Sequence, residues 1–423
     1  MSDKRKRHVL IGVVLVVGGS CRAADWPRWR GPDGTGHVPA GVPVPETLPA
    51  EPEVVWQVKV GIGFGSPVVS RGKVFYLDHQ RGKEVVHAAD AGSGKELWSS
   101  PLDEVFKDYQ SAAGPRTTPV ADGERVYVQS CRGEFRCLNV ADGRPIWRVN
   151  FVKDFAAEFI GEKGTATGAS RHGYIGPAVV DGDRIIVGVG GREGASVVCF
   201  EKLNGRVIWK SQNDVPGYSG PVIATIAGVR QVVSFTSEAV IGLDGGDGRL
   251  LWRSPVKTAF GRHVTTPVVV GDMVMVASHQ AGLVGIRVSR QQDALRAEHA
   301  WVAKASAINF SDPVAVGNFL YGIGRSNTLL CADVRTGENA WAQRGFFSGM
   351  VRRGYASFTV MKGNILVLTE GGQLLLVAAD PKQCRLIGKV KVCGQNWCSP
   401  AYADGRLFLR DERELRCVQL LPR

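Results

Sequence analysis

A short frame of residues recurs along this chain and restricts the folds that it can adopt. The frame has a small residue, an acidic residue or Asn two positions later, a polar residue followed by Gly, and a Trp four positions after that Gly. Its five copies end at Trp98, Trp147, Trp209, Trp252 and Trp341. Such a frame describes a strand, a tight turn whose Gly takes a positive φ, and a second strand with a buried indole. Five copies therefore predict a repeat protein.

A second mark precedes each frame and adds two more strands to each unit. A small or polar residue and Pro open a Val-rich alternating run, and this run is followed by a turn and another alternating run. The Pro pairs are Ser66-Pro67, Thr118-Pro119, Gly176-Pro177, Gly220-Pro221, Thr266-Pro267, Asp312-Pro313 and Ser399-Pro400, with Ser357 at the Pro place of the remaining unit. Each unit thus contains four short strands.

The spacing of these marks predicts an all-β, eight-bladed β-propeller of four-stranded antiparallel blades. Seven steps lead from Pro67 to Pro400, about 48 residues each, which is typical of propeller blades. The last unit ends before its Trp, and the strand at residues 53–58 can complete it and close the ring. The docking positions then hold Trp56, Trp98, Trp147, Trp209, Trp252, Trp301 and Trp341, with Ile387 in the eighth.

The first 24 residues have the layout of a secretory signal peptide. A basic start precedes an apolar run over residues 9–19, and small residues follow. The run is shorter than the ~20 residues of a membrane helix. We therefore expect a signal peptide at 1–24, an N-terminal extension at 25–52, a propeller at 53–423, and export to the periplasm or cell envelope. Lipidation of Cys21, and with it a lipid anchor, stays open beside cleavage after Ala23.

The frame resembles the tryptophan-docking motif of the pyrroloquinoline-quinone-like (PQQ-like) repeat β-propeller family. That family includes quinoprotein alcohol dehydrogenases and BamB-type outer-membrane assembly lipoproteins. The start Asp25-Trp26-Pro27-Arg28-Trp29-Arg30-Gly31-Pro32 is similar to that of exported single-propeller proteins of planctomycete bacteria. The resemblance covers residues 25–423 and implies the fold, whereas one propeller fold can have many functions.

The resemblance leaves two classes of function. The first is a non-catalytic scaffold or binding protein of BamB type, without cofactor or metal. The second is a quinoprotein dehydrogenase, in which PQQ lies on a calcium ion between a Trp and a vicinal disulfide, with an Asp as base. The chain has no Cys-Cys pair and no recognisable matching set of Glu, Asn and Asp. We therefore expect the scaffold and no catalytic residue, and keep PQQ with calcium as the alternative.

The cysteines divide into two groups. Cys137, Cys199, Cys331 and Cys417 occupy the small-residue position of the frame, so we expect them to be buried packing residues. The other group, after Cys21 is removed, is Cys131, Cys384, Cys393 and Cys398. In an exported protein these can form a disulfide or remain free thiols.

One mouth of the propeller channel is the expected binding site. Residues just before each inner strand should line this mouth, and aromatic and cationic side chains predominate there. The candidates are Arg116, His172, Tyr218, Arg262, His263, Phe310, Arg353, Asn396 and Trp397. Two linking segments, 99–116 and 148–173, are long, and 154–160 can form a short helix over the mouth. Alternatively, the aromatic side chains plug the channel and the Arg side chains bond strand ends.

Charge narrows the class of partner. The formal net charge of +12 falls to +8 after cleavage, because five basic residues and Asp3 are lost. Lys and Arg are scattered after Arg7, without a run, which argues against nucleic acid. We expect a monomer that binds an envelope protein, or an anionic or carbohydrate ligand, at the mouth, with peripheral membrane association left open.

Overall fold

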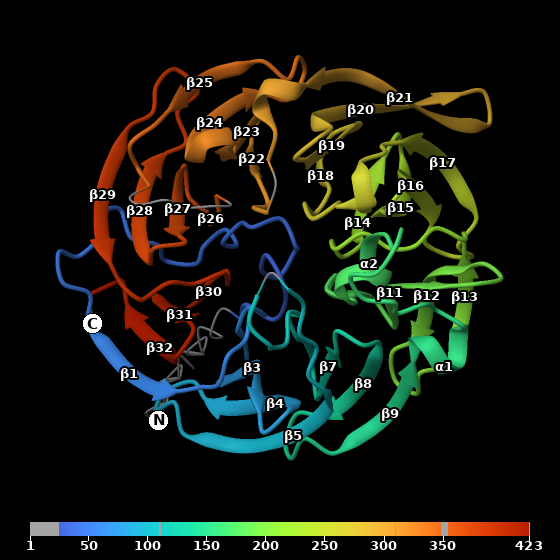
Figure 1. The fold of residues 1–423 in the computed structure, drawn as a ribbon. Coiled ribbons are helices and arrows are strands. Elements are labelled where there is room, and N and C mark those ends of the chain that lie inside the picture. Colours follow the sequence, from blue (N-terminus) through green and yellow to red (C-terminus); the bar gives the residue numbers. More distant parts are fainter. Residues whose placement is uncertain (1–24, 110, 309, 348–353, 423) are drawn as a thin grey trace, which may run out of the picture.

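The structure, a computed structural model, describes residues 25–109, 111–308, 310–347 and 354–422. The described residues form eight antiparallel four-stranded sheets around a central axis (Figure 1). This arrangement confirms the predicted eight-bladed propeller. Cys21, Arg353 and the signal peptide prediction lie outside the described residues.

The strands follow the repeat. Blades 1 to 4 contain β2 (Val68–Ser70), β3 (Lys73–Gln80), β4 (Lys83–Asp90) and β5 (Glu96–Glu104); β6 (Val120–Asp122), β7 (Arg125–Gln129), β8 (Glu134–Asn139) and β9 (Pro145–Asn150); β10 (Val179–Asp181), β11 (Arg184–Gly191), β12 (Ala195–Glu201) and β13 (Val207–Ser211); and β14 (Val222–Ile226), β15 (Val229–Phe235), β16 (Ala239–Asp244) and β17 (Leu250–Pro255). Blades 5 to 8 contain β18 (Val268–Val270), β19 (Met273–Ser278), β20 (Gly282–Gln291) and β21 (Ala294–Ala303); β22 (Val314–Val316), β23 (Phe319–Gly324), β24 (Thr328–Asp333) and β25 (Asn339–Gln343); β26 (Ala356–Met361), β27 (Asn364–Thr369), β28 (Gln373–Ala378) and β29 (Leu386–Lys391); and β30 (Ala401–Ala403), β31 (Arg406–Arg410), β32 (Glu414–Gln419) and β1 (Val54–Lys59).

The ring is closed as predicted. Strand β1 pairs antiparallel with β32, so that the N-terminal strand completes blade 8 and Trp56 lies opposite Cys417. In each blade the first strand lies nearest the axis and the last at the rim (Figure 1). We call the face with the segments that join consecutive blades the linker face. The opposite face, which carries the turns between first and second and between third and fourth strands, is the turn face.

The repeated Gly and Trp residues hold neighbouring blades together. The indole of Trp98 in blade 1 packs on Gly143 in the turn of blade 2, where φ is 71° and a Cβ would lie 2.5 Å from the ring. Its Nε1 donates to the carbonyl oxygen of Val140 at 2.9 Å. Trp56, Trp147, Trp209 and Trp301 repeat this contact with Gly94, Gly205, Gly248 and Gly337. Trp252 instead donates to Gln231 of its own blade at 2.5 Å.

The small-residue position of the frame lies directly across from the Trp. Cys137 pairs with Trp147, Cys199 with Trp209, and Cys331 with Trp341. These thiols are buried, and burial raises the pKa of Cys199 to about 12. The prediction of buried packing cysteines is confirmed. All eight described cysteines are free thiols, so no disulfide joins Cys131, Cys384, Cys393 and Cys398 in this structure.

The few helices are short. They are α1 (Phe151–Phe155), α2 (Gly168–His172) and the 3-10 turns η1 (Ala259–Gly261), η2 (Lys304–Ser306) and η3 (Arg325–Asn327). The predicted helix over 154–160 begins earlier, because Asn150 caps α1 by accepting a hydrogen bond from the Lys153 backbone at 3.1 Å. It ends at Ala156, whose φ is 54°. In the described part of the chain, no helix has the length and apolar character needed to span a membrane.

Residues 25–38 run along the inner strands around the central channel, and the segment then runs outward to Leu48, which lies against Gly388 in the rim strand β29. The sequence did not indicate this course. Trp26 pairs with Val69 of the inner strand of blade 1, and the Ala121 backbone of blade 2 donates to Pro27 at 2.8 Å. Further along, this segment reaches blades 6, 7 and 8, where it bonds Pro313, Val360 and Tyr402. Figure 1 shows the segment in blue near the ring centre. The segment thus bridges blades that do not touch one another.

Candidate functional site

The two longest linkers meet on the linker face through a buried group of charged side chains. The linker from β5 to β6 supplies Asp108 and Arg116, and the linker from β9 to β10 supplies Glu162 and His172. We call these four residues the charge cluster. Arg116 Nη1 lies 2.8 Å from Asp108 Oδ2. His172 Nδ1 lies 3.3 Å from that oxygen and 3.6 Å from Glu162 Oε1.

Backbone contacts strengthen the link between these segments. Arg116 Nη1 donates to the His172 carbonyl oxygen at 3.2 Å, and its Nη2 donates to Ser111 Oγ at 2.7 Å. Glu162 Oε2 accepts a hydrogen bond from the Tyr109 backbone at 2.7 Å. The cluster therefore fixes the relative position of the two linkers and leaves Arg116 with a balanced charge.

The charge cluster also has the ligand types of a metal site. Asp108, Glu162 and His172 each place one ligand atom within 4.8 Å of the others, a group that stands out in the described part of the chain. However, Arg116 already supplies a positive charge 2.8 Å from Asp108. A divalent ion would therefore enter against a neighbouring cation, and we assign these residues to holding the linkers together.

The predicted mouth residues His172, Tyr218, His263 and Asn396 are buried. Two of them, His263 and Asn396, bond to backbone groups, which differs from the predicted role in a binding site. His263 is fully buried and stacks on Phe235 with ring centroids 4.1 Å apart. Its Nδ1 lies 2.6 Å from Thr236 O, and burial lowers its pKa to about 4, so the ring is neutral. Asn396 is 2% exposed and its amide donates to Thr369 O at 3.0 Å. Both side chains satisfy backbone groups rather than face the mouth.

Aromatic side chains gather on the other side of the mouth, in the linkers that lead into blades 6, 7 and 8. Trp397 stacks on Tyr355 with centroids 5.3 Å apart, and Phe310 contacts Trp397 edge-on at 5.6 Å. Tyr355 was not among the predicted residues, since the residue predicted for this linker was Arg353. Phe310 and Trp397 are half-buried, so the cluster partly fills the mouth.

The remaining candidates lie between these two clusters. Tyr218 is buried, with its ring 5.8 Å from that of His172, and its hydroxyl has no hydrogen-bond partner among the described residues. Arg262 follows η1 and is half-buried. Nearby, the Arg171 guanidinium lies 4.4 Å from the ring centroid of Phe260 and so joins the linkers that enter blades 3 and 5.

The linker face also exposes apolar side chains. Tyr109 is 94% exposed, Ile160 45% and Phe260 44%. We call these three residues, together with Ile62 and Arg171, the linker-face patch. Aromatic residues and Arg are the types that concentrate in protein-protein interfaces. Arg116 at this face is already paired with Asp108, whereas Arg171 Nε and Nη1 have no hydrogen-bond partner among the described residues.

Comparison with known proteins agrees with the repeat. The family described as outer membrane protein assembly factor BamB matches this chain over residues 82–343. BamB of Salmonella typhimurium is 24% identical over 384 residues, which covers 85% of this chain and 86% of the relative. BamB of Shewanella oneidensis is 22% identical over 398 residues, covering 88% and 89%.

A solved structure shows the same fold. BamB from Moraxella catarrhalis superposes with a TM-score of 0.56 at 16% identity, covering 88% of this chain and 99% of that one. At this identity the likeness concerns the fold alone. The family match, by contrast, spans more than half of the sequence and contains the repeated frame. This chain therefore belongs to the BamB family of PQQ-like repeat β-propellers.

Proposed function

We propose that this chain is an exported, non-catalytic β-propeller that binds a protein partner of the cell envelope through its linker face. The relatives are named outer membrane protein assembly factors, and we extend that role, assembly of outer-membrane proteins, to this chain. The observation that carries the proposal is the linker-face patch, because exposed aromatic side chains surround linkers that are held rigid by the charge cluster.

Rigid linkers are what a binding face of this kind needs. Ordering a loop when a partner binds costs conformational entropy, and preorganised loops avoid that cost. Here Asp108, Arg116, Glu162 and His172 tie the two long linkers to each other. Tyr109, which is almost fully exposed, lies directly beside Asp108 and donates its backbone N–H to Glu162. The charge cluster thus positions an aromatic anchor without contacting the partner itself.

The residues present do not fit a bound PQQ. The quinoprotein class places the quinone between a Trp and two adjacent cysteines, and this chain has no such pair. At the mouth, the cysteine next to Trp397 is the single buried thiol of Cys398, and Trp397 is already stacked on Tyr355. We therefore propose no cofactor and derive no redox step.

Affinity purification of the tagged full chain from its own cell envelope tests the proposal. We expect a β-barrel assembly component to copurify. The double variant Tyr109→Ala, Phe260→Ala should recover at least about ten-fold less of this component, because aromatic anchors contribute much of the binding energy of an interface. Leu203→Ala, which removes a side chain 46% exposed on the turn face, is the control. Equal recovery with all three chains would contradict the linker face as the binding site.

Export is tested separately. The mature chain should start at Ala24 when it is isolated from the envelope fraction, by intact mass. A lipid-modified Cys21 at the N-terminus would instead show the lipoprotein alternative. The chemical test of the quinoprotein alternative is the absorbance of bound quinone after incubation with PQQ and calcium, followed by dye-linked alcohol oxidation. Turnover there would overturn the non-catalytic function.

A further inference from the structure

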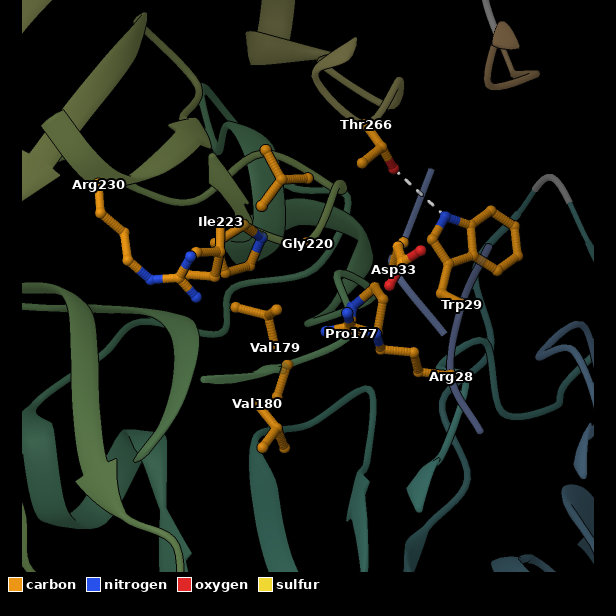
Figure 2. A pocket seen from close by; sticks show the side chains of 14 residues that line it. Arg28, Trp29, Asp33, Pro177, Val179, Val180, Gly220, Ile223, Arg230 and Thr266 are labelled. Atoms are coloured by element: carbon orange, nitrogen blue, oxygen red, sulfur yellow. Dashed lines mark hydrogen bonds between the residues drawn. The ribbon is translucent and has the colours of Figure 1, made fainter. Parts of the chain in front are cut away.

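The channel contains a cavity that the N-terminal segment helps to form. It has a volume of about 250 Å³ and lies between this segment and the inner strands of blades 3 and 4. Its walls are Arg28, Trp29, Asp33 and Gly34 on one side, and Pro177–Val180 and Gly220–Ile223 on the other, with Arg230 and Thr266 at the ends. Figure 2 shows Arg28 and Asp33 facing the blade residues Pro177 and Val179. We call this space between the N-terminal segment and blades 3 and 4 the channel cavity.

The channel cavity is separate from the linker face. Val180 is near the end of β10 and Arg230 is near the start of β15, and both strand ends border the turn face. The floor is formed where the inner strands of blades 3 and 4 approach closely. There a Cβ on Gly176 would meet Ser219 O, and a Cβ on Gly220 would meet Pro177 O. These glycines are needed for this close approach.

Trp29 is held rigidly at the wall of the cavity. Its Nε1 donates to Asp312 Oδ2 at 2.9 Å and lies 3.2 Å from Thr266 Oγ1, the contact drawn in Figure 2. Arg30, the next residue, is anchored by a hydrogen bond of 2.9 Å to Pro313 O and an ion pair of 3.5 Å with Asp312. The indole is nevertheless only half-buried. A fixed indole with free apolar surface in a cavity is a preformed contact for a ligand.

Two charged groups beside Trp29 retain hydrogen-bonding capacity. Arg28 Nε donates to Pro32 O at 2.8 Å, and within the described residues its two terminal nitrogens have no hydrogen-bond partner. The carboxylate of Asp33 likewise has no hydrogen bond within that part of the chain, and it is exposed. The site therefore offers donors from a guanidinium and acceptors from a carboxylate beside the apolar face of Trp29.

The balance of charge selects the class of ligand. Arg230 is paired with Asp181, and the positive charge of Arg28 is offset by Asp33, Asp181 and Asp122. An anion would be attracted by Arg28 but repelled by these carboxylates. A neutral ligand with several hydroxyls can use both Arg28 and Asp33 while its apolar C–H groups contact the indole.

We propose that the channel cavity binds one neutral sugar residue, either a free monosaccharide or the terminal residue of a glycan. Its volume of about 250 Å³ is enough for a single sugar ring. Binding should be weak, with a Kd of about 0.1–1 mM, because the ligand is small and makes few charge-assisted hydrogen bonds.

Titration of the purified chain with glucose, galactose and N-acetylglucosamine, and with their methyl glycosides, tests this proposal by calorimetry and saturation-transfer NMR. We expect saturable binding of at least one sugar. Asp33→Asn should weaken it at least about ten-fold, because a charge-assisted hydrogen bond is lost. Asp183→Asn is the matched control, since Asp183 is a turn-face carboxylate 85% exposed. Binding of a methyl glycoside would point to a glycan end, and binding of the free sugar alone to a monosaccharide.

Three outcomes would overturn the proposal. The first is that none of the sugars binds saturably. The second is that Asp33→Asn and Asp183→Asn bind the sugar equally well. The third is that inorganic phosphate or glycine binds more tightly than any sugar and competes with it, which would show an anion or zwitterion site. Since the variants lie on the turn face, copurification of an envelope partner should be unchanged by them, and failure of this proposal leaves the proposed function untouched.

Discussion

The contact between Gly143 and Trp98 should determine how firmly blades 1 and 2 are joined. A Cβ placed on Gly143 would lie 2.5 Å from the indole of Trp98, and the residue has a φ of 71°. Gly143→Ala therefore adds two costs. A non-Gly residue in the left-handed region costs about 1–2 kcal/mol, and overpacking against a buried ring costs a further ~1–3 kcal/mol. The expected loss of stability is about 2–5 kcal/mol.

A matched glycine isolates the second cost. Gly123 has a φ of 58°, and a Cβ there would meet no atom within 4 Å. Gly123→Ala should therefore lose only ~1–2 kcal/mol of stability, the cost of placing a non-Gly residue in the left-handed conformation. The assay is urea unfolding of both variants, followed by circular dichroism and Trp fluorescence. Combining Gly143→Ala with Trp98→Leu should recover part of the overpacking cost, because the smaller side chain leaves room for the new methyl group.

Equal destabilisation by Gly143→Ala and Gly123→Ala would refute this reasoning. It would mean that the indole moves away at no cost, so that the Gly of the repeat serves only the turn conformation. Packing of the Trp on the Gly of the next blade would then no longer explain why these two residues recur at a fixed spacing in the blades of this chain.

Three further predictions concern buried groups. Burial raises the pKa of Glu84 to about 7. Between about pH 4.5 and 7 the Glu84 carboxyl is therefore ionised in the unfolded chain but protonated in the folded chain, and the stability of the fold falls as the pH rises. Above pH 7, Glu84→Gln should be more stable than wild type by an amount on the order of 3 kcal/mol, and at pH 4 the two chains should be equally stable. Thermal unfolding measures this, and a difference in stability that is the same at every pH would contradict the prediction. Arg116→Met should lose about 3–5 kcal/mol of stability, because the cation beside the buried Asp108 carboxylate is removed. This loss should appear as faster proteolysis of the linkers, while Arg144→Met, at a side chain 86% exposed, should change little. Thiol reagents at pH 8 should label half-buried Cys384 first and the other seven described cysteines only on unfolding; early labelling of Cys199 would contradict its burial.

The sequence predicted the ring because its signals repeat. Each blade supplies the same Gly, Trp and small residue, and closure follows from the one blade that lacks its last strand. Trp98 and Cys137 could be placed because each has equivalents in other blades. The course of residues 25–48 could not be predicted, since Trp29 and Arg30 reach distant blades without any periodic pattern.

The site was only partly predictable for the same reason. Counting back from the start of each inner strand predicted Arg116 and Trp397 at the mouth, and in the structure Arg116 pairs with Asp108 while Trp397 stacks on Tyr355. It could not show that Arg116 is neutralised, because its partner Asp108 comes from a linker without a repeated pattern. His263 was expected at the mouth, but its ring is buried and stacks on Phe235. Counting along the sequence does not show which way the side chain of a linker residue points.

Photo-crosslinking in living cells shows whether this protein binds its partner through the linker face. A photoreactive amino acid at position 109, where Tyr109 is 94% exposed, is compared with one at position 183, where the Asp183 side chain is 85% exposed on the turn face. We expect position 109 to crosslink to an envelope β-barrel assembly component and position 183 not to. Crosslinks to that component from position 183 alone, or from neither position, would contradict this expectation.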